Sequence, residues 1–127
     1  MLRANGISPT HQRVAIAHVL FERKCHLSAD QILIAVTTGN AETSKATVYN
    51  TLKLFVEKRL IRELIVDPAK IYYDSNTAPH HHFYDAESGE LTDFAADTVR
   101  IEGVPNLPAG SVSDGIEIII RTRKTAI

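Results

Sequence analysis

Cysteine occurs once in this chain of 127 residues, and tryptophan does not occur at all. With Cys25 as its only thiol, the chain cannot form an internal disulfide or a zinc site with four cysteine ligands. No apolar run approaches the ~20 residues that cross a bilayer, and the opening residues lack the apolar core of a signal peptide. These absences predict a cytoplasmic protein with no membrane contact, in which Cys25 is a buried or half-buried residue at a helix end.

An overall excess of charge is also missing, because the net charge is only −1. The charges are nevertheless divided unevenly along the chain. Residues 1–65 hold nine Lys or Arg against five acids, whereas residues 66–127 hold five against ten. This division suggests that the first half binds a polyanion and that the second half binds cations or a protein partner. A hydrophobic content of 44% is enough for one compact domain or two very small ones.

The segment 44–61 is predicted to form an amphipathic helix that begins at Ser44, whose hydroxyl can cap the first free amides. Its apolar stripe is Val48, Leu52, Phe55, Val56 and Leu60. The opposite face carries Lys45, Thr47, Tyr49, Asn50, Lys53 and Lys58. Cationic and hydrogen-bonding side chains on the leading turns suit a DNA major groove. An ordinary amphipathic surface helix would show the same pattern.

Two further helices are predicted before this segment. The first starts at Ser8-Pro9, with Pro9 at the first helical position, and runs to about Lys24. Arg13 lies near its start and could reach a phosphate, although a solvated arginine fits equally well. After a short break at residues 25–27, Ser28 to Gln31 forms a capping box that opens a helix ending near Gly39. Together the three helices predict a helix-turn-helix arrangement.

A β-hairpin is predicted directly after the third helix. Residues 60–66 and 70–74 are rich in β-forming side chains, and Asp67-Pro68-Ala69-Lys70 between them is a turn signal. A hairpin in this place is the wing of a winged helix, with Lys70 near its tip as a DNA contact. The wing therefore favours DNA binding over the surface-helix interpretation.

The polar residues 76–79 mark a hinge between a winged-helix domain, residues 1–75, and a second domain, residues 80–127. The second domain is predicted to contain strands at 81–85, 90–94 and 116–123, a short helix at 95–101 and a loop at 104–113. So few elements cannot form a stable hydrophobic core alone. The apolar run 118–120 would be an exposed strand edge that is prone to aggregate. We therefore expect a homodimer that pairs through this sheet.

Three consecutive histidines, His80 to His82, suggest a cation site. Alternate residues of an extended segment point the same way, so His80 and His82 can share a face while His81 points to the other. Imidazole suits Zn, Fe, Mn or haem iron. Candidate partners are His26, Asp74 and Asp93. A solvated histidine loop is the alternative, and His11 and His18 are interpreted as plain surface or packing residues.

Four segments, SKATVYNTL, the hairpin, HHHFYDAESGELTDF and IEIIIRTRK, resemble the Fur family of metal-responsive regulators, from about Ile7 to Lys124. Within that family, HHHFY and the Pro-rich loop before IEIIIRTRK are most similar to Irr, the iron response regulator of alphaproteobacteria. The resemblance implies an α+β fold, with an N-terminal winged helix-turn-helix domain followed by a small C-terminal α/β dimerisation domain.

The resemblance also implies site residues. Tyr49 and Asn50 would face the DNA bases, with Ser44, Thr47 and Lys53 nearby. The family's interdomain metal site corresponds to His26, Asp74, His80, His82 and Asp93, with Asp74 where many relatives carry Glu. The family's structural zinc site is expected to be absent, because Asp85 and Ser88 stand at its cysteine positions. A further family site involving His81 is discounted, since the neighbouring regions offer Arg100, Arg121 and Arg123.

Irr-like proteins are linked to haem as well as to metal. Some carry a Cys-Pro haem motif, but His26 follows Cys25 here, so haem would bind through His80, His81 and His82. The function implied is a homodimeric regulator of iron homeostasis on AT-rich palindromic DNA, with recognition helices about 34–36 Å apart. It would bind DNA when the iron concentration is low and dissociate from DNA when haem indicates that iron is abundant. An Fe- or Mn-dependent repressor of the Fur, Mur or PerR type is the alternative.

Two other classes of protein fit parts of the pattern. A metal hydrolase could use His80, His82 and an acid, but no nucleophile motif or phosphate-binding Gly-rich loop accompanies them. A metal or haem carrier would need no DNA-facing helix and no wing. The sequence therefore predicts a DNA-binding protein that is not an enzyme.

Overall fold

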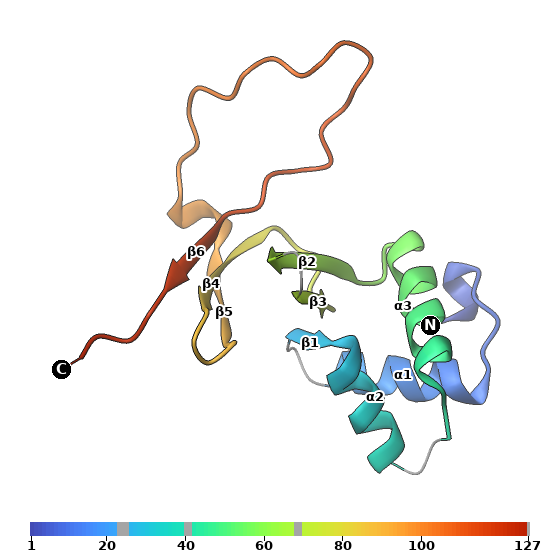
Figure 1. Ribbon diagram of the computed structural model, residues 1–127. Coiled ribbons are helices and arrows are strands. Elements are labelled where there is room, and N and C mark those ends of the chain that lie inside the picture. The colour runs from blue at the N-terminus through green and yellow to red at the C-terminus, as the bar shows by residue number, and fades with distance from the viewer. Residues whose placement is uncertain (23–25, 40–41, 68–69, 127) are drawn as a thin grey trace. The chain divides into compact units, whose positions relative to one another are not determined.

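The computed structural model describes residues 1–22, 26–39, 42–67 and 70–126 (Figure 1). Cys25 and the centre of the predicted turn, Pro68-Ala69, lie outside the described residues. The chain divides into two compact units, Met1–Thr77 and Ala78–Ile127. Helices and two small sheets make up the fold, so the predicted α+β class is confirmed. Among the described residues no helix has the length and apolar character needed to cross a membrane.

The first unit opens with a 3-10 turn, η1 (Arg3–Asn5), and two helices, α1 (His11–Glu22) and α2 (Ala29–Thr38). The prediction that α1 starts at Ser8-Pro9 was wrong, because the Thr10 hydroxyl accepts the Arg13 amide (3.1 Å) and caps the helix two residues later. The capping box of α2 is confirmed. Ser28 accepts the Gln31 amide at 3.2 Å, and the Gln31 side chain accepts the Ser28 amide at 2.9 Å.

Helix α3 (Lys45–Glu57) carries the predicted cap, because the Ser44 hydroxyl accepts the Thr47 amide at 3.1 Å. Its buried face is Val48, Thr51, Leu52 and Phe55. The helix stops before the predicted end at residue 61, since Arg59 adopts a positive φ of 60° and turns the chain. The buried face joins a core with residues of α1 and α2, chiefly Ile16, Leu20, Ile32 and Val36.

A three-stranded sheet completes the first unit. Its strands β1 (His26–Ser28), β2 (Arg62–Asp67) and β3 (Lys70–Asp74) lie in the order β1-β3-β2, and both pairings are antiparallel. The predicted hairpin is confirmed as β2 and β3. The predicted break between the first two helices contains a strand that the sequence did not predict, because residues 26–28 form β1 and place His26 opposite Asp74.

The second unit is built on β4 (His80–Asp85), β5 (Leu91–Ala95) and β6 (Ile119–Thr122), in the order β5-β4-β6. Strand β4 is antiparallel to β5 and parallel to β6. The helix predicted at 95–101 is reduced to one 3-10 turn, η2 (Ala96–Thr98), because β-branched residues follow and its apolar side chains have little to pack against. The last strand is shorter than the predicted range 116–123.

Candidate metal centre and nucleic-acid interface

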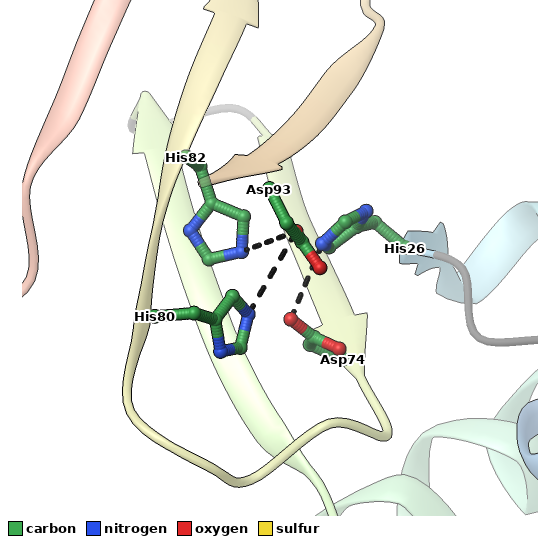
Figure 2. A group of neighbouring side chains, drawn as sticks. All are labelled: His26, Asp74, His80, His82 and Asp93. Carbon is green, nitrogen blue, oxygen red and sulfur yellow. Dashed lines mark ion pairs between the residues drawn. The ribbon is translucent and has the colours of Figure 1, made fainter. Parts of the chain in front are cut away.

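Half-buried His26 and buried Asp74 form a pair within the first unit. The antiparallel register of β1 and β3 sets the two residues opposite one another, and His26 Nε2 lies 3.2 Å from Asp74 Oδ2 (Figure 2). The other carboxylate oxygen, Oδ1, accepts the Asn76 amide at 2.8 Å. That bond orients the carboxylate so that Oδ2 faces the imidazole, as outer hydrogen bonds orient metal ligands. We call these two residues the first-unit pair.

His80, His82 and Asp93 form a second group, which lies entirely within the second unit. His80 and His82 share one side of β4 with ring centroids 4.5 Å apart, and the register places His82 opposite Asp93 on β5. Asp93 Oδ1 lies 3.4 Å from Nε2 of His82 and 3.8 Å from Nε2 of His80 (Figure 2). Both histidines are buried, while the Asp93 side chain is 43% exposed. We call these residues the second-unit trio.

The tautomer of His80 is set by its backbone. Its Nδ1 lies 2.6 Å from the carbonyl oxygen of Ala78, and only an N–H at Nδ1 can donate to that oxygen. In the neutral ring the lone pair is then on Nε2, the atom that faces Asp93. A histidine held in this way is prepared to bind a metal ion through Nε2.

The spacing of these donors fits a first-row divalent ion. Ligand atoms about 2.1 Å from one ion are about 3.4 Å apart at a tetrahedral angle and about 3.0 Å apart at an octahedral one. The pairs His26–Asp74 and His82–Asp93, at 3.2 and 3.4 Å, fall in this range. Imidazole nitrogen with carboxylate oxygen is also the donor set that Zn, Fe and Mn share.

His81 faces the other side of β4, as the alternation of a strand requires. Its Nδ1 accepts the backbone amide of Ile118 at 3.1 Å, and its ring packs against Phe94 with centroids 5.5 Å apart. The His81 ring therefore links β4 to the chain entering β6 and is separate from the second-unit trio.

The exposed face of α3 carries the predicted DNA contacts. Ser44, Tyr49, Asn50 and Lys53 are exposed, and Thr47 is half-buried with its hydroxyl 2.9 Å from that of Ser44. Sequence reasoning placed Lys45 on this face but not among the site residues. Its ammonium lies 5.8 Å from the centre of the Tyr49 ring and 3.5 Å from an Asp30 oxygen, so it makes a cation–π contact with that ring.

Lys70 lies near Tyr49, and Arg13 belongs to another part of the unit. A cavity of about 300 Å³ is lined by Tyr49, by the start of α2 and by residues 70–73, including Lys70. Arg13 is half-buried and donates from Nη1 to the Ser8 carbonyl at 2.9 Å, so its guanidinium is partly engaged by its own chain. A larger cavity, about 560 Å³ between η1 and α1, contains none of the predicted site residues.

The turn after β4 is closed by Asp85. Its Oδ1 accepts the amides of Glu87 (2.9 Å) and Ser88 (3.3 Å), and its carbonyl accepts the Gly89 amide at 2.7 Å. Burial acts to raise the pKa of Asp85, but the hydrogen bonds from Glu87 and Ser88 and the nearby charge of Lys124 outweigh it and lower that pKa. A carboxylate with backbone donors therefore closes this turn.

We expect Asp85→Asn to flatten the acid sensitivity of the second unit. A lowered pKa means that the folded state binds fewer protons than the unfolded chain. The contribution is therefore complete above the unfolded pKa, about 3.9, and is lost as the pH falls through the lower folded value. Urea midpoints between pH 5 and pH 3, without metal, should fall less for the variant than for the parent. Asp114→Asn, an exposed acid of the same unit, is the control and should follow the parent. Equal acid sensitivity of Asp85→Asn and the parent would contradict this account.

Comparison with known proteins gives a family from the sequence and a related fold from solved structures. The sequence profile of the Ferric uptake regulator family matches residues 4–106. The peroxide-responsive repressor PerR of Staphylococcus aureus (strain Mu50 / ATCC 700699) is 34% identical over 93 residues, 73% of this chain and 63% of the relative's length. Among solved structures, the ferric uptake regulator from Francisella tularensis with iron superposes with a TM-score of 0.79 at 22% identity, covering 95% of this chain and 94% of that one. A zinc-bound manganese uptake regulator gives 0.72 at 19% identity, covering 98% and 96%. The chain therefore belongs to the Ferric uptake regulator family.

Proposed function

We propose that this chain is a homodimeric transcriptional regulator that binds DNA through α3 and the β2–β3 wing, under the control of one divalent metal ion. The ligands of the ion are His26, Asp74, His80, His82 and Asp93. In this assignment residues 1–75 bind DNA, 76–79 are the hinge, and 80–127 dimerise and sense the ion. As a DNA-binding regulator the protein acts in the cytoplasm and is not an enzyme.

The observation that carries the proposal is the division of suitable donors between the two units. A tightly held divalent ion of this class takes four to six ligands. Among the described residues, the first-unit pair offers two donors and the second-unit trio offers three, so neither group reaches four alone, whereas together they supply five. Asp74 and His80 are six residues apart in the chain, which limits their separation to about 20 Å. A short hinge of this kind allows the two groups to share one ion.

An ion shared by the two units would couple metal binding to DNA affinity. When bound, the metal supplies a cross-link that holds both units in one relative orientation. The chain's own part is to present α3 at a spacing that matches two successive major grooves, about 34–36 Å apart in a dimer. If one orientation binds DNA better, the ion shifts the population toward it and raises DNA affinity.

The names of related structures support the same class of ion. Their names specify iron for the Francisella tularensis protein, manganese for the Pseudomonas aeruginosa protein and zinc for a manganese uptake regulator. All three ions accept the imidazole and carboxylate donors of this chain. We therefore propose Fe, Mn or Zn at this site, and no cysteine-bound structural zinc.

Haem is a second candidate effector, as in Irr. The observation that favours it is the pair of imidazole Nε2 atoms on one side of β4, presented by His80 and His82. In this hypothesis haem competes with the metal ion for these nitrogens and lowers the affinity of the protein for DNA. His81 would have to give up its bond from Ile118 to take part. A titration in which the Soret band of added haem does not shift would remove this candidate.

The test of the main proposal is fluorescence anisotropy with an AT-rich palindromic duplex at fixed salt. We expect the purified protein to bind the duplex at least about tenfold more tightly with Mn²⁺ than without metal, the middle of the usual range for coupled sites. A shuffled duplex controls for general phosphate affinity, which does not depend on the base sequence. Failure to prefer the palindrome at any metal concentration would contradict the proposal. Addition of haem to the Mn²⁺ sample distinguishes the two hypotheses. Haem should lower DNA affinity in an Irr-like protein and should not change it in a regulator of the Fur, Mur or PerR type.

A further inference from the structure

Residues 100–117 form an open arm between η2 and β6. Every residue in this range is exposed, and none belongs to a helix or strand. In Figure 1 the arm leaves η2, swings out as a wide loop and returns to β6. Within the arm, Arg100 pairs with Glu102 at 2.7 Å, and the Ser111 amide bonds the Pro108 carbonyl at 3.1 Å.

The arm is unusually apolar for a segment with this exposure. Its exposed large apolar side chains are Ile101, Val104, Leu107, Val112 and Ile116, and Val112 is 86% exposed. Single exposed apolar residues are ordinary, but several close together in one segment are typical of an interaction surface. Pro105 and Pro108 fix φ at two positions, which lowers the conformational entropy lost when such a segment docks.

Strand β6 begins two positions after the end of the arm and is an edge strand among the described residues, because the order of the sheet is β5-β4-β6. Ile120 on β6 is 41% exposed. An open apolar edge of this kind is normally covered or paired. The arm does not cover it within its own chain, since the arm is exposed throughout.

The charges of the two segments are complementary. The arm carries Arg100 and three acids, Glu102, Asp114 and Glu117, for a net charge of −2. Residues 119–126 carry Arg121, Arg123 and Lys124 and no acid, for a net charge of +3. A segment that is acidic and apolar therefore adjoins one that is basic and apolar. In a twofold pair, each would meet the complementary segment of the other copy.

We infer that the arm is an exchange arm, which docks on residues 119–124 of a second copy of this chain. These residues comprise β6 and the basic side chains Arg123 and Lys124 that follow it. The 18 residues of the arm and the four of β6 together make 22, and a standard protein interface uses about 20–30 residues a side. The inference rests on the proposed homodimer and adds the segment that holds it together.

The first test measures the dimer dissociation constant by sedimentation. We expect the variant Val104→Ser/Leu107→Ser/Val112→Ser to raise that constant by at least about 100-fold, given the apolar area that three such side chains bury. All three are exposed in the single chain, so the fold of the unit should persist and can be checked by circular dichroism. Val14→Ser/Ile34→Ser removes exposed apolar side chains from α1 and α2 and should leave the constant unchanged.

The second test locates the arm directly. A photo-reactive benzophenone amino acid at position 112, in mixed ¹⁴N and ¹⁵N protein, should give cross-links between differently labelled chains that map to residues 119–124. Cross-links confined to one chain, or a dimer constant unaffected by the triple variant, would overturn the inference while leaving DNA binding and dimerisation intact. A protein that stays monomeric at every concentration would overturn both the exchange arm and the proposed dimer, and anisotropy would still report DNA binding separately.

Discussion

His82→Ala should abolish the effect of metal on DNA binding. His82 is only 1% exposed, shares one side of β4 with His80 and lies opposite Asp93 in the β4–β5 register. Loss of an outer-shell partner typically reduces metal affinity 10–100-fold, so loss of a ligand itself should reduce it at least about 100-fold. With Mn²⁺ held well below the new dissociation constant, DNA affinity should equal that of the metal-free parent. Isothermal titration calorimetry for the metal and anisotropy for the duplex measure the two effects.

The matched control is His81→Ala. His81 is also buried on β4, but its ring faces away from the second-unit trio and bonds Ile118. This variant loses an imidazole of the same size from the same strand, so it separates the loss of a ligand from general damage to the sheet. We expect it to keep parental metal affinity, even if its urea midpoint falls. If His82→Ala kept parental metal affinity as well, His82 would not be a ligand.

The double variant Tyr49→Ala/Lys53→Ala should strongly weaken DNA binding without changing metal affinity. Both side chains are exposed on α3, and the buried face of the helix does not involve them. A base contact is worth about 1–3 kcal/mol, and loss of one phosphate contact also lowers the slope of log K against log salt by about 1. Together these changes should weaken operator binding by at least about 100-fold. Anisotropy at three salt concentrations gives the affinity and the slope.

Lys58→Ala is the control for this second prediction. Lys58 is an exposed lysine at the other end of the same helix, so its loss removes the same charge from a different place. We expect near-parental binding to the palindrome. Unchanged binding by Tyr49→Ala/Lys53→Ala would mean that α3 is not the recognition helix. A protein that bound metal but no DNA at all would instead be a carrier.

Local signals accounted for most of the fold. Capping at Ser28 and Ser44 depends on residues three positions apart, and the β2–β3 hairpin depends on a turn between two β-rich runs, so the sequence was sufficient for each. Strand β1 was missed because it has three residues and its partner strand lies more than 40 residues further along the chain. A strand that short has no detectable period, and only the tertiary pairing stabilises it.

The candidate site was predictable to a similar extent. The period of two in a strand placed His80 and His82 on the same side, and Asp93 lies on the neighbouring strand as expected. His26 could not be placed beside Asp74 from the residues alone, because the β1–β3 register brings them together. The sequence named His26 only as a candidate partner, the resemblance assigned it to the site with Asp74, and the register provides the physical reason. Lys45 was left out of the predicted site because its position over Tyr49 depends on side-chain packing.

The most direct test of the central claim is reciprocity between metal and DNA. If one ion sets the orientation that DNA selects, thermodynamic linkage requires DNA to raise metal affinity by the same factor by which metal raises DNA affinity. Calorimetric titration of Mn²⁺ into the protein, with and without a saturating palindromic duplex, measures that factor. We predict tighter Mn²⁺ binding in the presence of the duplex, by the factor found in the anisotropy experiment. Equal Mn²⁺ affinity with and without the duplex would contradict the account.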